Sequence, residues 1–245
     1  MDFEILSQVK SSLSQIALRR RDSVPVFIKR LKTDVDGKKR LDEVSVELKK
    51  VDHWNCLRFF SSFTDKDNFY CLAMELSVAG ESLDKLIIKQ DMAAEPFSEK
   101  LIATWGLQIA RAFAHLHGLK IIHKALEPKA LIVQNKKHIV VGNFELSIVE
   151  NEKNCKKSQL DSTPIFMAPE ILKEQPFDSK VDVWSFGVLL YQIATFDMPV
   201  IANNNENKNQ SISIYFFFSS IPIVQFKILL FKFQRSLFSN LIKFQ

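Results

Sequence analysis

The alternation of apolar and polar positions predicts several short strands. Residues Val24 to Leu31 (VPVFIKRL) alternate and are rich in β-branched side chains, which is typical of a strand. The same criterion predicts strands over Arg58 to Phe63 and over Phe69 to Leu76. Two short apolar runs, 131–133 and 139–141, flank a polar turn and predict one more pair of strands.

Apolar residues at helical spacing predict three helices. The first is expected over 41–51, where one face carries Leu41, Val44, Leu48 and Val51. Residues 98–117 are amphipathic, with Ser98 as a candidate N-cap and Gly118 as a C-terminal stop. Residues 182–195 are strongly apolar and predict a buried helix. Strands with one helix, followed mostly by helices, predict an α+β fold with two lobes.

The composition changes abruptly after Ala202. Residues 203–245 contain eight Phe but no Ala, Gly, Asp, Thr, His, Cys, Met or Trp. The longest uncharged apolar run there, 211–226, has 16 residues and is interrupted by Pro222. A membrane-spanning helix needs about 20 residues, so we do not expect 211–226 to contact a membrane. This segment is predicted to be a low-complexity tail outside the fold, of the kind that translated non-coding sequence would give.

Charge and cysteine content limit the classes of function. The net charge is +5, but the tail contributes +4 of it, so residues 1–202 carry about +1 and predict no nucleic-acid surface. The three cysteines, Cys56, Cys71 and Cys155, are scattered and lack metal-ligand spacing, which favours a reduced compartment. The first residues include acidic side chains and no apolar core of a signal peptide. We therefore expect a cytoplasmic protein.

Residues 123–133 (HKALEPKALIV) resemble the catalytic loop of protein kinases, whose pattern is H-R-D-L-x-P-x-N followed by apolar residues. Ala125 stands where that family has its catalytic Asp, and Ala130 where it has a metal-binding Asn. Glu127 replaces a Lys that is common in serine/threonine kinases, and Lys124 replaces the Arg of the motif. The loop therefore keeps the His, Leu, Pro and apolar positions of the family's pattern but lacks the side chains that react or bind metal.

Three further segments carry the same resemblance, in the right order and over residues 1–200. Thr163 to Leu172 (TPIFMAPEIL) resembles the end of a kinase activation segment. Asp182 to Leu190 (DVWSFGVLL) resembles the start of the large helix of the C-terminal lobe. Met74 and Glu75 resemble the start of the hinge between the lobes, with Met74 as gatekeeper. Together they imply a two-lobed protein-kinase-like fold, truncated after its central buried helix.

The resemblance places a vestigial ATP site around Lys29, Phe27, Met74 and Glu75. Lys29 matches the Lys of the family's V-A-I-K strand, although a solvated Lys on a strand edge is an equal alternative. Phe27 replaces the small residue that packs on adenine, and strand alternation puts it on the Lys29 face. The expected glycine-rich loop, residues 7–16, contains no Gly. A phosphate cradle of the family's kind is therefore not expected.

The partners of the Lys and of the metal are also altered. Counting back from His53 without a gap puts Val44 at the position of the Glu that pairs with the Lys, and a bulge would be needed to bring in Glu43. The metal-binding D-F-G becomes Asn143-Phe144-Glu145, so Asn143 stands at a metal-ligand position without a carboxylate. The alternative, in which Glu145 holds Mg²⁺, needs several further oxygen ligands.

These replacements predict a pseudokinase that binds proteins as a scaffold or regulator in signalling, with no catalytic residue, no metal and no cofactor expected. The alternatives are a serine/threonine kinase that binds ATP through Lys29 with a relocated carboxylate, and a truncated or mispredicted fragment. An N-terminal-lobe strand that ends in a bulky residue and the run Trp105-Gly106-Leu107 resemble the SCY-like pseudokinases of membrane trafficking. We predict an N-terminal lobe over 1–75, a partial C-terminal lobe over 76–202 and the tail over 203–245.

Overall fold

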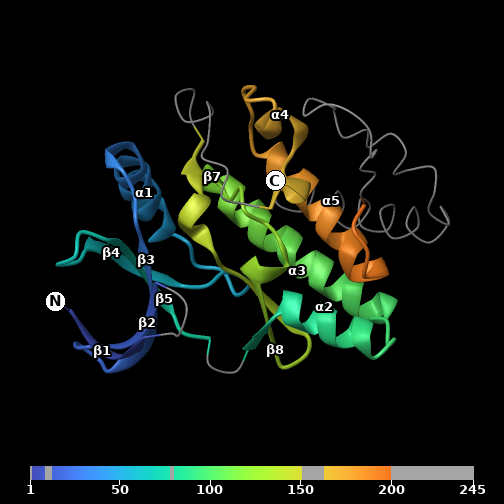
Figure 1. The fold of residues 1–245 in the computed structure, drawn as a ribbon, viewed down its shortest axis with the longest axis horizontal. Helices are drawn as coiled ribbons and strands as arrows, with labels where there is room; N and C mark the ends of the chain where they lie inside the picture. Colours follow the sequence, from blue (N-terminus) through green and yellow to red (C-terminus); the bar gives the residue numbers. More distant parts are fainter. Residues whose placement is uncertain (1, 9–12, 78–79, 151–162, 200–245) are drawn as a thin grey trace, which may run out of the picture.

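A curved antiparallel sheet with one long helix forms the N-terminal part of the protein, and a mostly helical part lies beside it (Figure 1). The computed structural model describes residues 2–8, 13–77, 80–150 and 163–199. The predicted α+β fold with two lobes is confirmed over these residues. The predicted end of the fold after the central helix, and the tail with its apolar run 211–226, lie outside the described residues.

The N-terminal sheet has five strands in the order β1-β2-β3-β5-β4. They are β1 (Phe3–Gln8), β2 (Ser14–Arg19), β3 (Val24–Leu31), β4 (Phe59–Thr64) and β5 (Tyr70–Glu75). The strand predicted over Val24 to Leu31 is confirmed with the same bounds, and the next two lie within a residue of the expected ones. The region 7–16, where the family's glycine-rich loop was expected, contains the end of β1 and the start of β2, which pair with each other, and its residues 9–12 lie outside the described part.

The two faces of this sheet carry separate clusters of apolar side chains. On one face Val26 and Ile28 of β3 are fully buried with neighbours from β2 and β5. On the other face Phe27 and Leu31 pack against the main core, which continues into the helical part. The sheet curves so strongly that Phe3 of β1 stacks on Phe63 of β4, with ring centroids 5.4 Å apart. The outer edges of the sheet therefore approach each other.

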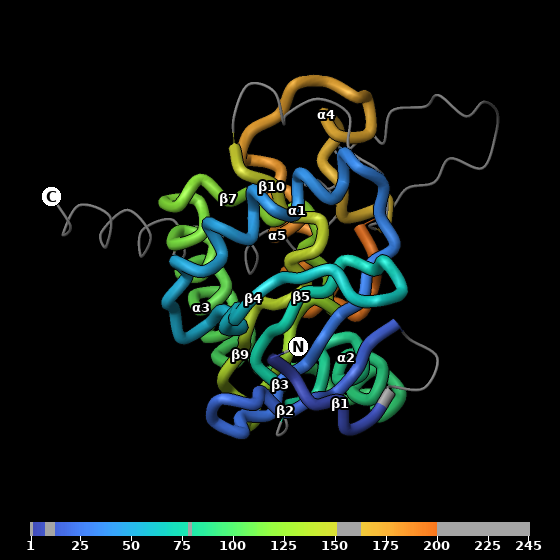
Figure 2. The backbone as a smooth tube through the Cα atoms, turned by 90° about the vertical axis from the view of Figure 1, so that its left-hand side faces the viewer, coloured from blue at the N-terminus to red at the C-terminus, as the bar shows by residue number. Residues whose placement is uncertain are grey.

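Helix α1 (Val35–Leu48) covers the face that carries Phe27. It begins earlier than predicted because the Asp34 side chain caps it, accepting a hydrogen bond from the Gly37 N–H at 2.7 Å. It ends at Leu48, so Val51 lies beyond it and yet remains in the core. Figure 2 shows α1 crossing near β7 and β10, and it contacts both strands.

Among the described residues, short strands and four helices make up the second part. The helices are α2 (Leu83–Met92), α3 (Glu99–Gly118), α4 (Pro169–Leu172) and α5 (Lys180–Thr195). The strands are β6 (Gly80–Ser82), β7 (Ile121–Ile122), β8 (Leu131–Gln134), β9 (His138–Val141) and β10 (Ile148–Val149). Single 3-10 turns occupy Pro128–Ala130, Phe144–Leu146 and Pro164–Phe166. The pair predicted from the apolar runs is confirmed as β8 and β9, which are antiparallel.

Helix α3 is the centre of this part. Its predicted N-cap is confirmed, because the Ser98 hydroxyl accepts a hydrogen bond from the Leu101 N–H at 3.3 Å. The helix runs through Gly118, and the left-handed residue that follows it is Lys120. Helix α5 lies beside α3 and is buried along one face by Val188, Leu189 and Ile193, whereas the Val183 side chain is exposed. Within the described ranges, no helix is long and apolar enough to cross a bilayer.

Candidate functional site

Lys29 lies in the middle of the sheet, on β3, and its ammonium is engaged. Its Nζ donates a hydrogen bond to Asn143 Oδ1 at 2.9 Å and forms an ion pair with Glu145 Oε1. The side chains of Lys29 and Glu145 are 28% and 14% exposed, so the pair is shielded from bulk solvent. The alternative of a solvated Lys on a strand edge is therefore wrong. The alternative in which Glu145 binds a metal conflicts with this contact, because one of its two carboxylate oxygens is already paired with Lys29.

Helix α1 reaches this site through Arg40. Val44, at the position counted for the family's Glu, is fully buried in a regular helix without a bulge. Arg40 Nη1 instead donates hydrogen bonds to the backbone oxygens of Glu145 and Ser147, each at 2.9 Å. Sequence reasoning missed this contact, because Arg40 and Glu145 are 105 residues apart. The carboxylate at Lys29 thus comes from the segment after β9, and α1 supports that segment.

Phe27 and Met74 form an apolar wall beside Lys29. They are cross-strand partners on β3 and β5, and both pack in the main core. Phe27 therefore lies on the Lys29 face, as alternation predicts. Glu75 ends β5, where its N–H donates to the Arg58 carbonyl at 2.8 Å.

Asp182 of α5 holds the backbone of the catalytic-loop segment. Its carboxylate is 1% exposed and accepts hydrogen bonds from the N–H groups of His123 at 2.9 Å and Lys124 at 2.8 Å. His117 of α3 adds a contact from its Nε2 to Asp182 Oδ2 at 2.8 Å. One buried carboxylate therefore joins α3, the loop and α5.

His123 is fully buried and orients the segment on its other side. The Ala125 N–H donates to His123 Nδ1 at 3.2 Å, so the ring proton is on Nε2, which donates to the Gly142 carbonyl at 2.7 Å. Phe144 packs edge-on against the ring at 5.5 Å between centroids. The retained His and Phe thus serve packing and loop shape.

The positions that carry chemistry in the family hold methyl groups here. Ala125 and Ala130 are each 2% exposed, and neither side chain can accept a proton or bind a cation. Asn143 has a left-handed backbone (φ 66°), which Asn tolerates better than most residues, and its side-chain oxygen is used by Lys29. Among the described residues no three His, Cys, Asp or Glu side chains gather as a metal site would require.

A second polar cluster lies around Glu127, for which the sequence showed only that it replaces a Lys common in serine/threonine kinases. Its carboxylate is 4% exposed. Thr163 Oγ1 donates to Glu127 Oε2 at 2.6 Å, and Lys129 Nζ lies 2.8 Å from Oε1. This cluster ties the catalytic-loop segment to the start of the 163–172 segment. Lys124, at the family's Arg position, is buried with its ammonium 5.6 Å from the centroid of the Phe177 ring.

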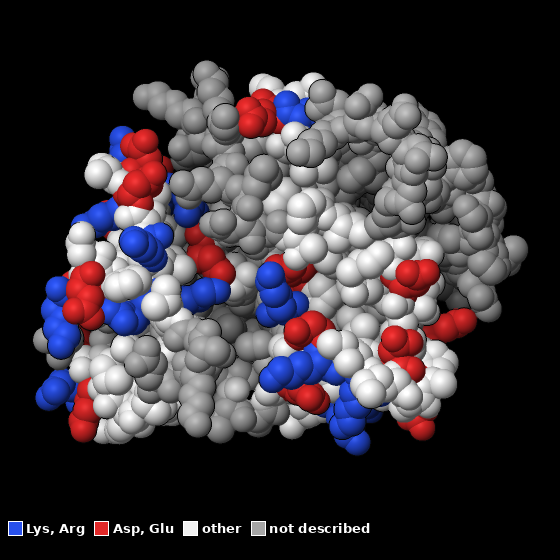
Figure 3. All heavy atoms as spheres, in the orientation of Figure 1, with Lys and Arg blue, Asp and Glu red and all other residues white. Residues whose placement is uncertain are grey.

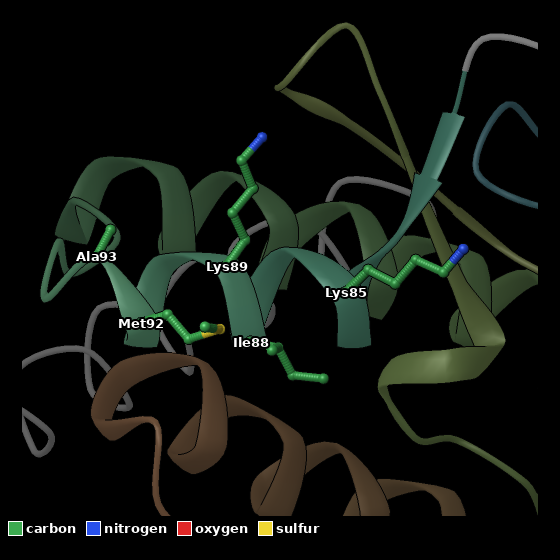
Figure 4. A pocket seen from close by; sticks show the side chains of 5 residues that line it. All are labelled: Lys85, Ile88, Lys89, Met92 and Ala93. Carbon is green, nitrogen blue, oxygen red and sulfur yellow. The ribbon is translucent and has the colours of Figure 1, made fainter.

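Two pockets lie away from these residues. One, of about 510 Å³, is lined by α2 residues and is open to solvent; Figure 4 shows Ile88 and Met92 pointing to one side of the helix and Lys89 to the other. The second, of about 410 Å³, lies between β1 and the turn after β4 and includes Arg30, Asp65 and Cys71. Neither is lined by Lys29, Asn143 or Glu145.

Comparison with known proteins identifies the family. The protein kinase domain model matches residues 10–243. The chain is 26% identical over 190 residues to the serine/threonine-protein kinase Nek5 of Mus musculus, covering 77% of this chain and 30% of the relative. It is 35% identical over 140 residues to an Aurora kinase of Yarrowia lipolytica (57% of this chain, 36% of the relative) and 31% over 157 residues to human serine/threonine-protein kinase Nek11 (64% and 24%).

The matched regions span only between 24% and 36% of the lengths of these curated relatives. The family model covers most of the chain, and its match over residues 10–243 contains the strand of Lys29, the catalytic-loop segment and the helix of Asp182. The chain therefore belongs to the protein kinase domain family.

Proposed function

We propose that this kinase domain transfers no phosphoryl group and acts by binding a protein partner, as a scaffold or regulator. The observation that carries the proposal is the pair of buried methyl groups, Ala125 and Ala130, at the catalytic and metal-binding positions. Phosphoryl transfer by this family depends on a base, metal ligands and a Lys that contacts phosphate. Here the first two are missing and Lys29 is bound by Asn143 and Glu145.

The intact frame supports a role in binding. Asp182 and His123 fix the shape of the loop through hydrogen bonds that need no nucleotide or metal. On the face drawn in Figure 3, basic and acidic side chains are interspersed, which suits a protein partner better than a nucleic acid. Cys56 and Cys71 are free and buried thiols, in keeping with a cytoplasmic location.

Finer assignments belong to the same proposal. The boundary between the two lobes at residue 75 and the end of the C-terminal lobe at residue 202 follow the sequence pattern. The proposal that residues 203–245 form a tail outside the kinase fold is tested by sequencing the transcript beyond codon 202. A different downstream reading frame is expected there. The resemblance to SCY-like pseudokinases is part of the same proposal, and its support is the run Trp105 to Leu107 early in α3.

The second candidate is an ATP-binding serine/threonine kinase. The names of the relatives favour it, and Lys29 occupies the expected strand position. It requires a relocated carboxylate for the metal, and the carboxylate within reach of Lys29 is Glu145. Nucleotide binding and phosphoryl transfer separate the two candidates.

The first test is a thermal-shift titration with ATP, with and without Mg²⁺ or Mn²⁺. A ligand at 100 times its dissociation constant stabilises a protein by roughly 2.7 kcal/mol, so family-type binding would raise the melting temperature clearly. We expect no shift for the full chain, and a shift only for Phe27→Ala, which removes the ring from the Lys29 face. A shift of several degrees in the unmodified chain would contradict the proposal.

The second test is transfer of radiolabelled phosphate, with an active kinase run in parallel. We expect none above a denatured control, and none from Ala125→Asp, because that change supplies a base without a metal site. Transfer by either protein would establish the kinase alternative.

A further inference from the structure

The face of the N-terminal sheet that points away from α1 holds a pocket. Val26 and Ile28 of β3 are buried on this face, and strand alternation places Arg30 there as well. The edge strands β1 and β4 approach each other on this side, and a pocket of about 410 Å³ lies between them. A pocket of this size accommodates a small organic molecule. Because Lys29 lies on the opposite face, the pocket is separate from the site described above.

Apolar side chains form one part of the pocket lining. Phe3 of β1 and Phe63 of β4 stack across the gap, with their ring planes 21° apart. Ile5 follows Phe3 along β1, lines the same pocket and is 47% exposed. Two aromatic rings and one aliphatic side chain thus offer a surface on which the apolar part of a ligand would be removed from water.

Another part of the lining is charged and held in a fixed arrangement. Arg30 Nε donates to Asp65 Oδ2 at 2.6 Å, and Arg30 Nη2 donates to Asp67 Oδ2 at 2.8 Å. The guanidinium also lies over the Phe69 ring, 4.3 Å from its centroid. The side chains of Arg30 and Asp65 are 10% and 12% exposed, so their charges compensate each other away from bulk solvent. The positive charge of Arg30 is therefore already matched by carboxylates of the protein.

Carboxylates outnumber cations among the described residues of this lining. Asp2, Asp65 and Asp67 carry three negative charges, whereas Arg30 and Lys66 carry two positive charges, which leaves a formal charge of −1. The Asp67 side chain is 55% exposed, and Asp2 is exposed as well, so both carboxylates are accessible to a ligand. An ammonium group is attracted by such carboxylates and by the faces of aromatic rings.

We propose that this pocket binds a small organic cation, in which an ammonium group is carried on a short apolar body. The apolar body packs against Ile5 and the stacked rings of Phe3 and Phe63, and the ammonium faces Asp67 and Asp2. The site goes beyond the proposed function, because it requires neither Lys29 nor a nucleotide. It gives the N-terminal lobe a ligand of its own.

Three probes with one carbon skeleton test the preference for a cation: phenylpropylamine, phenylpropanol and phenylpropionate. Their dissociation constants for the full chain are measured by ligand-observed NMR at low ionic strength. The amine should bind at least about tenfold more tightly than the propionate, because it meets carboxylates that repel an anion. The pocket at α2, which is lined by Lys85 and Lys89 without an acidic residue, would favour the propionate. No binding of the amine, or equal binding of the propionate, would overturn the proposal.

Ile5→Ser and Leu6→Ser form a matched pair of variants that locates the site. The two residues are neighbours on β1 and are 47% and 54% exposed, but only Ile5 lines the pocket. Ile5→Ser should bind the amine about fivefold more weakly, because the ligand loses apolar contact area. Leu6→Ser should bind it as the unmodified chain does. Equal affinities of the two variants would place the amine elsewhere and overturn the proposal.

Asp67→Asn tests the carboxylate and decides the matter if Ile5→Ser does not fold. Its affinity for the amine should fall about threefold, and the difference between amine and propionate should narrow. Asp52→Asn, an equal change of charge at an exposed residue after α1, should leave both affinities unchanged. An undiminished preference for the amine in Asp67→Asn would overturn the role assigned to that carboxylate. Phosphoryl transfer by the unmodified chain would refute the proposed function and leave these affinities as predicted.

Discussion

Within residues 123–130, the positions that keep the family's residues and the positions that have lost them differ sharply in their hydrogen bonding. The frame is fully bonded: Asp182 accepts from two backbone N–H groups and contacts His117, and both ring nitrogens of His123 are used. The reacting positions, Ala125 and Ala130, hold side chains that form no polar contact. The shape of the loop therefore does not depend on the groups that would perform the reaction.

Breaking the frame should have the largest effect. Asp182→Asn replaces an acceptor-only carboxylate by an amide whose NH₂ group meets an N–H donor, inside the core. We expect a loss of about 3–5 kcal/mol in the free energy of unfolding, measured by urea denaturation. The control is Asp178→Asn, an exposed residue just before α5, which should cost less than about 0.5 kcal/mol. Similar losses in the free energy of unfolding for both variants would show that Asp182 does not stabilise the backbone of the catalytic-loop segment.

Substitutions in the Lys29 pair should have a smaller and asymmetric effect. Lys29→Met leaves the mostly buried Glu145 carboxylate without its cation, so we expect a loss of about 1–3 kcal/mol in the free energy of unfolding. Glu145→Gln leaves the more exposed ammonium with Asn143 and should cost less than about 1 kcal/mol. Urea denaturation of both variants gives the comparison. Equal costs would mean that Glu145 is hydrated and does not depend on Lys29.

The smallest effect is expected where the N-terminal lobe packs on α3. His53 stacks on His115 of α3, and its pKa is lowered by burial, then by the charges of His115 and Arg111. Because the folded chain binds this proton less readily than the unfolded chain, whose His pKa is near 6.5, stability should fall as the pH drops below that value. The loss ends once the pH passes below the lowered pKa.

His53→Gln should therefore lose less stability than the unmodified chain between pH 7.5 and pH 5.5, as measured by urea denaturation at each pH. His138→Gln serves as the matched control for removal of one imidazole. A His53→Gln variant with the same pH slope as the unmodified chain would exclude His53 as its source.

The elements that sequence predicted well are those with a long regular pattern. β3 alternates over eight residues and α3 has both a capping serine and a periodic face, so their bounds could be derived from local chemistry. β7 and β10 have two residues each, too few for any period, and α2 buries only Leu83 and Ile87. Those three elements exist because of contacts that form only in the folded chain.

At the site, the sequence predicted the replacements but not the new partner of Lys29. The substitution of Asn143-Phe144-Glu145 for the family's motif was visible, and so was the absence of a Glu at Val44. The pairing of Lys29 with Glu145 joins residues 116 apart and depends on how the 143–147 segment is held. Arg40 gave no local signal, because a basic residue on an amphipathic helix usually lies in solvent.

The curvature of the N-terminal sheet has a consequence for how the protein associates with itself. An open sheet exposes two rows of unpaired backbone groups, which invite strand addition by other molecules. Here β1 and β4 are those edges, and the stack of Phe3 on Phe63 brings them together, while an irregularity between Ile5 and Ser7 bends β1. The aromatic stack thus holds the two edge strands close to each other on the face where Val26 and Ile28 are buried, so the approach of other strands to either edge is restricted on that side.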